Sequence, residues 1–329
     1  MIRCHKTTQS VEWRGNATQS PILYMGNKLR LIRRGLVNLF PSNIKKFVDV
    51  FSGSAVVSMN TKAESYYLND NDEILIQFYN LFNAYAPKDL ISHIKLRIIQ
   101  FDLPTKATPR SVTDKNVLEQ QKIAYGKFRD FYNQRKNILD LYTLMFFAFS
   151  QQFRVNKDGD FNMPLGNNCF SAQNEQAIHK GIYFFKQPNI HLSNRDFEVF
   201  LDDISLENSD FVYFDPPYSH SLATYNERNN KWHKNDDLRL LAYCANLNQK
   251  GIKFGISNIF TNNNAENALL KDFCKENALN IFSPSSFTYS ACGKGNKSHK
   301  EVFICNYEVT SNNHNFVALK NKNVITNTF

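Results

Sequence analysis

The sequence lacks several patterns that would assign it to a class at once. Its six cysteines are scattered along 329 residues, with no Cys-x-x-Cys pair and no histidine spacing that would complete a zinc site. We therefore expect reduced thiols and no metal. Residues 1–20 contain no apolar segment of a signal peptide, and no apolar run approaches the length that spans a bilayer. We expect a cytoplasmic protein that does not enter membranes.

A glycine pattern is also missing. The segment that follows the first expected strand, at residues 47–51, does not contain G-x-G-x-x-G. That absence disfavours a dinucleotide cofactor, whose pyrophosphate needs such a cradle.

What the chain does have is an excess of positive charge. It carries 39 Lys and Arg against 30 Asp and Glu, for a formal charge of +9 and a pI near 9.1. Such an excess favours polyanionic partners, although it can also serve solubility alone. With 42% hydrophobic residues, the chain can bury one sizeable core and has room for an insertion.

Short apolar runs alternate with amphipathic stretches. Residues 47–51 read as a buried strand that turns tightly into a helix, and residues 65–68 read as a second strand. A helix is expected over residues 73–82, capped by Asn71 or Asp72. Further strands are expected at residues 190–192, 211–214, 253–257 and 301–306. This alternation predicts a mostly parallel α/β sheet that is covered on both faces.

The pattern changes between residues 86 and 186, where helical stretches such as residues 118–133 replace the strands. Within this stretch, residues 153–156 and 161–163 read as a β-hairpin with Asp-Gly at its turn. We expect an inserted domain at 86–186, a main domain at 1–85 and 187–310, and a loose polar tail at 311–329.

The strongest local signal is Asp215-Pro216-Pro217-Tyr218, directly after the apolar run at residues 211–214. Ligands of open α/β sheets bind at the carboxyl ends of the strands. The two prolines fix the backbone, so the Asp215 carboxylate and the Pro216 carbonyl can face one crevice. Tyr218 can stack on a planar base beside them. The alternative is a proline-stiffened loop without chemistry.

This tetrapeptide resembles the catalytic motif of amino-group DNA methyltransferases, whose Asp form is typical of adenine-specific members. Together with residues 24–28 (YMGNK), 47–54 and 68–70, it follows the order and spacing of the Dam-like alpha class of DNA adenine-N6 methyltransferases. The resemblance implies a Rossmann-like, S-adenosylmethionine-dependent methyltransferase sheet. It also implies that the insertion is a mainly helical DNA-recognition domain carrying the hairpin.

The resemblance further implies a set of residues that bind S-adenosylmethionine. Asp70, at the end of the second strand, can accept both hydroxyls of a ribose, although it can equally cap a helix. Taken singly, the others also have structural explanations as turn glycines, surface charges or core residues. The implied cofactor-binding residues are Tyr24, Lys28, Asp49, Phe51, Gly53, Asp70, Asp196 and Phe197.

Residues 149–166 resemble the DNA-reading hairpin of the same family. Arg154 offers a bidentate fork for guanine O6 and N7, and Pro164 can pack on a thymine methyl group; Arg154 can alternatively bind phosphate. Asn156 and Asn168 complete the expected DNA-binding set. Asn168 stands where some relatives carry a second Arg, and Leu23 replaces a lysine that reads a flanking guanine. The outer bases of the site are therefore open, and a palindrome centred on AT, such as GATC or CATG, is a hypothesis.

We expect a site-specific DNA adenine methyltransferase that acts on duplex DNA through Asp215, Pro216 and Tyr218, with the target base flipped out. It would belong to a restriction-modification system, whose endonuclease acts on the same site. An N4-cytosine enzyme is an alternative, although Ser is more frequent there in place of Asp215. An RNA or protein-glutamine amide methyltransferase is another, although Asn is common there. A catalytically silent DNA-binding module on the same scaffold is the third.

Overall fold

The computed structural model describes residues 17–24, 26–109, 114–218, 232–262, 265–285, 300–310 and 315–319. Over these residues the chain forms a nine-stranded sheet in the order β3-β2-β1-β4-β5-β8-β7-β9, with β6 paired to β5. The strands are β1 (Ile44–Asp49), β2 (Ala63–Asn69), β3 (Ile190–Ser193), β4 (Phe211–Phe214), β5 (Lys253–Asn262), β6 (Ala265–Glu266), β7 (Asn280–Pro284), β8 (Lys300–Cys305) and β9 (Phe316–Ala318).

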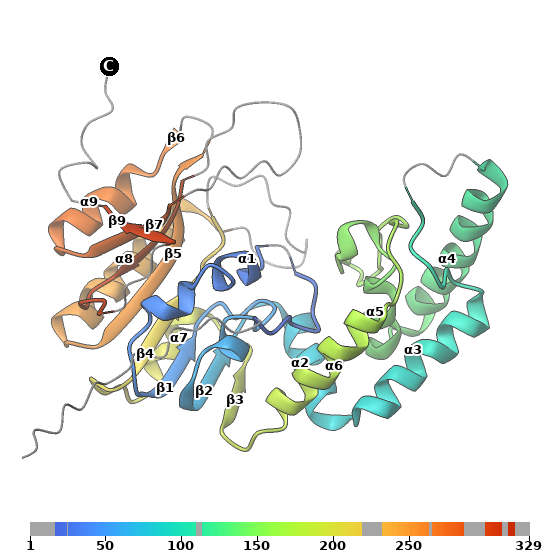
Figure 1. Ribbon diagram of the computed structural model, residues 1–329, viewed down its shortest axis with the longest axis horizontal. Coiled ribbons are helices and arrows are strands. Elements are labelled where there is room, and N and C mark those ends of the chain that lie inside the picture. The colour runs from blue at the N-terminus through green and yellow to red at the C-terminus, as the bar shows by residue number, and fades with distance from the viewer. Residues whose placement is uncertain are drawn as a thin grey trace, which may run out of the picture.

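The helices lie on both sides of this sheet and beyond its β3 edge (Figure 1). The α-helices are α1 (Leu29–Ile32), α2 (Glu73–Ala84), α3 (Pro87–Phe101), α4 (Lys115–Arg135), α5 (Ile138–Met145), α6 (Ala172–Phe185), α7 (Phe197–Asp202), α8 (Lys234–Gln249) and α9 (Ala268–Glu276). Three short 3-10 helices are η1 (Leu36–Leu39), η2 (Ser58–Asn60) and η3 (Phe149–Gln151) among the described residues.

The carboxyl ends of β1, β2 and β4 meet at one edge of the sheet. β1 runs parallel to both neighbours, with Asp49 opposite Leu68 on one side and Tyr213 on the other. Asp49 is the last residue of β1, whereas Asp70 and Asp215 directly follow β2 and β4. Three carboxylates are therefore brought to the same edge, where α/β sheets bind ligands.

Both faces of the sheet are buried. Along β1 and β4, Phe47 and Tyr213 face one apolar cluster with α1 and α2, whereas Val48 and Val212 face another with α7, α8 and α9. Alternate side chains of a strand point to opposite faces, so continuous apolar runs are what a doubly covered sheet requires. The predicted mostly parallel α/β sheet is confirmed in the five strands from β3 to β5, and β7, β8 and β9 add antiparallel neighbours.

The predicted elements are found with shifted bounds. The first strand ends at Asp49, so Val50 and Phe51 lie in the following turn rather than in the strand. The strand expected at residues 253–257 continues to Asn262. Helix α2 begins as predicted and is capped by Asp72, whose carboxylate accepts the Ile74 amide at 3.0 Å.

Helices α3, α4, α5 and α6 gather at one end of the molecule, beyond β3, while α8 and α9 lie at the other end beside β5 (Figure 1). The first group derives from the insertion, and its apolar residues belong to the same buried cluster as Phe47 of the sheet. The insertion is thus packed firmly on the main sheet. Its bounds as a recognition domain stay a prediction.

The ribbon expected at residues 153–163 is a loop with one antiparallel bridge, between Val155 and Phe161. The Asn133 side chain, from α4, accepts the Phe161 amide at 2.8 Å and donates to the Phe161 carbonyl at 3.3 Å. The two arms are joined by main-chain bonds from Asn156 to Asp160 and from Asn162 to Arg154, while α4 satisfies the outward-facing main-chain groups of Phe161.

Asn156, one of the expected DNA-binding residues, does not project from this loop. Its Oδ1 accepts the amides of Asp158 and Asp160 at 3.0 and 2.8 Å, so the side chain folds back and holds the turn. Gly159 has a φ of 78°, as the expected Asp-Gly turn requires.

The tail was expected to be loose from residue 311, and part of it is not. Residues 316–318 form β9, which pairs with β7, and Phe316 is buried. Pairing with the edge of β7 and burial of the Phe316 ring stabilise this strand. The polar residues around it gave no strand pattern in the sequence.

None of the helices in the described ranges combines the length with the apolar content needed to cross a membrane.

Candidate active site

The loop after β1 contacts the residues that follow β2. The Gly53 amide donates to Oδ2 of Asp70 at 2.9 Å, and the Gly53 carbonyl accepts the Tyr79 hydroxyl at 2.6 Å. Gly53 has a φ of 51°, and a Cβ there would lie 3.2 Å from the Tyr24 ring. A glycine is therefore favoured both by the backbone conformation and by the approach of Tyr24.

Asp49 ends β1 as a buried carboxylate with an incomplete set of partners. Oδ2 accepts the Ser58 hydroxyl at 2.5 Å, whereas Oδ1 is buried and finds no donor among the described residues. Burial raises the pKa of Asp49 to about 7, helped by the charges of Asp215 and Asp70 and opposed by Ser58. An unsatisfied buried acceptor is costly in a folded protein, so this oxygen fits a ligand that donates a hydrogen bond.

Asp70 is held at the end of β2 by main-chain donors. Its Oδ1 accepts the Asp72 amide at 2.9 Å, and its Oδ2 accepts the Gly53 amide. Burial raises the pKa of Asp70 to about 7, and the two amides lower it in part. Because Asp72 caps α2, the helix-cap alternative for Asp70 is excluded.

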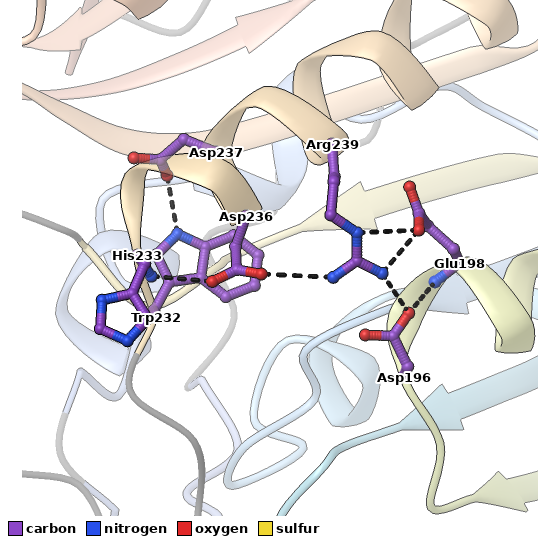
Figure 2. A network of polar contacts seen from close by, with 7 residues as sticks. All are labelled: Asp196, Glu198, Trp232, His233, Asp236, Asp237 and Arg239. Carbon is purple, nitrogen blue, oxygen red and sulfur yellow. Dashed lines mark hydrogen bonds and ion pairs between the residues drawn. The ribbon is translucent and has the colours of Figure 1, made fainter.

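Three aromatic rings lie beside this edge. The centroid of Phe51 is 5.7 Å from Phe197 and 5.4 Å from Trp232, and Phe197 is 5.9 Å from Trp232. Asp196, the residue before Phe197, caps α7 and binds Arg239 with Oδ1 (Figure 2). The predicted residues Phe51, Asp196 and Phe197 are thus brought together.

Asp215, after β4, pairs with Lys28. Lys28 Nζ lies 2.8 Å from Asp215 Oδ1, 3.1 Å from the Gly26 carbonyl and 3.9 Å from Glu301 Oε1. The Tyr218 hydroxyl donates to Asp215 Oδ1 at 3.3 Å, and Lys28 Nζ is 5.3 Å from the centre of the Tyr218 ring. The N-terminal block and the motif after β4 therefore form one charged cluster.

The protonation of this cluster follows from burial and pairing. Burial raises the pKa of Asp215 above its usual range, although Lys28 and the Tyr218 hydroxyl lower it part of the way back. Burial alone would lower the pKa of Lys28, but Asp215 and Glu301 raise it overall. Lys28 therefore stays positive and favours a negative Asp215.

The sequence of the chain matches a family model described as D12 class N6 adenine-specific DNA methyltransferase over residues 24–283. The chain belongs to this family. The match spans the Tyr24 block, the three carboxylates and the insertion, so the predicted Dam-like relationship is confirmed.

Curated relatives of this D12 class protein agree. Modification methylase StsI of Streptococcus sanguinis is 32% identical over 301 residues, which are 90% of this chain and 44% of that protein. Type II methyltransferase M.FokI of Planomicrobium okeanokoites is 29% identical over 310 residues, 92% of this chain and 44% of that protein. Type II methyltransferase M.MjaIII of Methanocaldococcus jannaschii is 25% identical over 272 residues, 76% and 83% of the two chains. The chain thus spans less than half the length of the first two.

Membership in a methyltransferase family implies S-adenosylmethionine as the methyl donor. The residues of this D12 class site fit that molecule. Asp70 can accept from ribose hydroxyls, Phe51 and Phe197 suit a purine ring, and the lone oxygen of Asp49 suits a donor group. Gly53 leaves room next to Tyr24.

The hairpin residues of this family member lie close to the Tyr24 block. Phe153 stacks on Tyr24 with centroids 5.7 Å apart and packs edge-on against Phe78 of α2. The next residue, Arg154, donates from Nε to Asn162 Oδ1 at 3.1 Å. The loop that carries Arg154 is thereby joined to the Tyr24 block through Phe153. Of the other predicted DNA-binding residues, Pro164 and Asn168 are exposed and Asn156 is partly buried.

Several residues near the site escaped sequence reasoning. Glu301 lies in β8 and reaches Lys28 across the sheet, and only the tertiary fold makes them neighbours. The signal for Trp232 was its rarity, since the sequence has two tryptophans. Phe149 begins the segment that resembles the DNA-reading hairpin, but it was not among the expected DNA-binding residues. Phe149 is 58% exposed and precedes Ser150 and Gln151, which have φ angles of 54° and 53°.

Proposed function

We propose that this chain transfers the methyl group of S-adenosylmethionine to N6 of an adenine in duplex DNA. The observation that carries the proposal is the position of Asp215, paired with Lys28 at the sheet edge shared with Asp49 and Asp70. The family and the names of the relatives support the same reaction.

The exocyclic nitrogen of adenine is a poor nucleophile because its lone pair is delocalised into the ring. In our proposal the Asp215 carboxylate and the Pro216 carbonyl each accept one N6 hydrogen. These hydrogen bonds localise the lone pair on nitrogen and stabilise the positive charge that develops there. S-adenosylmethionine, when bound, supplies an electrophilic methyl group, and the amine loses its proton after transfer.

Lys28 and Tyr218 complete this arrangement. Lys28 holds Asp215 in its ionised, acceptor form through the 2.8 Å ion pair. The target adenine must leave the duplex, which costs a few kcal/mol of stacking and pairing. Stacking on Tyr218 would offset about 1–3 kcal/mol of that cost.

DNA recognition falls to the loop at residues 153–163 and its neighbours. We propose that Arg154 reads a guanine edge and that Pro164 gives an apolar contact, with Asn168 close by. Phe149, whose side chain is exposed close to this loop in sequence, adds an aromatic ring that can contact DNA bases. A short palindrome centred on AT stays a prediction. The modified DNA would be protected from an endonuclease acting on the same site, as the name of the modification methylase relatives suggests.

The test is methyl transfer from labelled S-adenosylmethionine to duplex DNA by the unmodified chain and by Asp215→Ala. We expect N6-methyladenine from the first and no transfer from the second, whereas both bind S-adenosylhomocysteine. Full activity of Asp215→Ala would defeat the mechanism, and methylated cytosine would favour the N4-cytosine alternative. Long-read sequencing of DNA from expressing cells would identify the recognition sequence.

A further inference from the structure

A network of charges joins the start of α8 to the start of α7, and the proposed reaction does not use it (Figure 2). Arg239 donates from Nε and Nη2 to Glu198 Oε2 at 2.9 and 2.5 Å, and from Nη2 to Asp196 Oδ1 at 2.8 Å. Its Nη1 donates to Asp236 Oδ1 at 3.2 Å. One guanidinium therefore binds three carboxylates from two helices.

The same guanidinium also lies over an aromatic ring of the proposed cofactor pocket. Its central carbon is 4.9 Å from the centroid of Phe197, within the range of a cation–π contact. Asp196, one of its carboxylate partners, directly precedes Phe197 and caps α7 by accepting the Glu198 amide at 3.1 Å. Arg239 thus contacts two residues, Asp196 and Phe197, that the family resemblance assigned to cofactor binding.

At the other end of the network lies Trp232, which precedes α8. Its indole Nε1 donates to Asp237 Oδ1 at 2.7 Å, and its ring meets Phe51 edge-on at 5.4 Å. His233, which follows Trp232, donates its amide to Asp236 Oδ2 at 2.8 Å, and Asp236 also binds Arg239. The position of the indole is therefore linked to Arg239 through the first turn of α8.

We propose that Arg239 is a positioning residue of the cofactor pocket. By holding the first turn of α8 against α7, it places Trp232 as a third aromatic wall, beside Phe51 and Phe197, for the purine ring of the nucleoside cofactor. An indole that is hydrogen-bonded at one end and apolar along its body suits a partly polar heterocycle. This inference rests on the proposed function, because it concerns the same cofactor.

The experiment uses the intrinsic fluorescence of Trp232. The chain has two tryptophans, so Trp13→Phe leaves Trp232 as the only one. In that background we expect S-adenosylhomocysteine to change the Trp232 emission, with a dissociation constant that calorimetry reproduces. Arg239→Gln should raise this constant at least about tenfold, a loss of about 1.4 kcal/mol. It should also expose Trp232 to acrylamide quenching.

Two companion variants separate positioning from general stability. Arg239→Lys keeps the charge but not the planar fork, so it should recover part of the affinity. Arg195→Gln is the matched control. Arg195 directly precedes Asp196, and its replacement removes the ion pair with Asp203. The dissociation constant should stay within about twofold of that of the unmodified chain, well below the roughly tenfold change expected for Arg239→Gln.

If Arg239→Gln does not fold, Glu198→Gln removes one carboxylate of the network and should weaken binding in the same direction. An unchanged dissociation constant in the variant that folds would overturn the inference, even where its melting temperature falls. Trp232 emission that does not change when S-adenosylhomocysteine binds would also overturn the inference. By contrast, an unmodified chain that binds no S-adenosylhomocysteine would defeat the proposed function itself.

Discussion

Lys28 Nζ lies 2.8 Å from Oδ1 of Asp215, and the exposed fractions of the two side chains are 5% and 17%. The pair joins the N-terminal block of the chain to the motif after β4, which are separated in sequence by four of the nine strands and by the insertion. In this shielded position the ion pair decides the charge of the residue that is proposed to hold the substrate amine.

Lys28→Met should remove the counter-ion of Asp215, whose pKa burial already raises above its usual range. The pKa would rise further, so a smaller fraction of Asp215 is ionised at a given pH, and the carboxylate is regained as the pH increases. We expect methyl transfer to fall by about 100-fold or more, by analogy with the loss of one transition-state contact. Measuring the rate across the pH range should show the acid limb displaced to higher pH. Lys28→Arg, which keeps the charge, should retain much of the rate, and an unmoved limb in Lys28→Met would contradict this reading.

Asp49 predicts how stability depends on pH. Its pKa is about 7 in the folded protein, whereas the unfolded chain ionises near the ordinary value of 3.8. Between these values the unfolded state loses a proton that the folded state keeps, so raising the pH favours unfolding. We expect the free energy of unfolding to fall as the pH rises from about 4 to about 7 and then to level off.

Urea unfolding at several pH values would measure this slope, which Asp49→Asn should reduce because the amide does not ionise. Ser58→Ala is the complementary variant. It removes the hydroxyl donor that lowers the pKa of Asp49, so the decline should extend to higher pH. Equal slopes in the unmodified protein and Asp49→Asn would show that the folded protein already ionises Asp49 near pH 4, close to the ordinary pKa of a carboxyl group.

Gly53 and Gly26 form a matched pair of positions for testing whether the loop after β1 binds the cofactor. Both have positive φ, 51° and 79°, so an alanine costs about 1–2 kcal/mol of stability at either position. Only at Gly53 would the new Cβ press on Tyr24, at 3.2 Å, while Gly26 has no described atom within 4 Å. Gly53→Ala should therefore also weaken S-adenosylhomocysteine binding, and calorimetry on both variants would show it. Equal affinities would place the cofactor elsewhere.

Arg154 and Asn156 differ in what they should control. Arg154→Ala is expected to lose about 1–3 kcal/mol of binding at the recognition site and less on random DNA, because a base contact is specific. Asn156→Ala should instead lower stability by about 1–2 kcal/mol, since its oxygen holds two main-chain amides of the turn. Filter binding and thermal unfolding of both variants test this. Equal losses on both DNAs would mean that Arg154 contacts phosphate.

The sequence by itself determined six of the nine strands and the motif after β4. Apolar runs such as residues 211–214 are typical of strands in a doubly covered sheet, and a parallel sheet brings the ends of its strands to one edge. Asp70 and Asp215 could be placed there without coordinates, because each directly follows such a run. Asp49 was expected inside the first strand, and its position at the end of β1 comes from the structure.

The tertiary structure alone decided which partner each group meets. The Asn133 side chain binds the main chain of Phe161, β7 orders residues that composition marks as loose, and Arg239 bridges two helices far apart in sequence. Local patterns carry the period and polarity of a segment, but a hydrogen bond or ion pair depends on the direction of approach of distant main-chain and side-chain atoms. That direction is set only when the whole core packs.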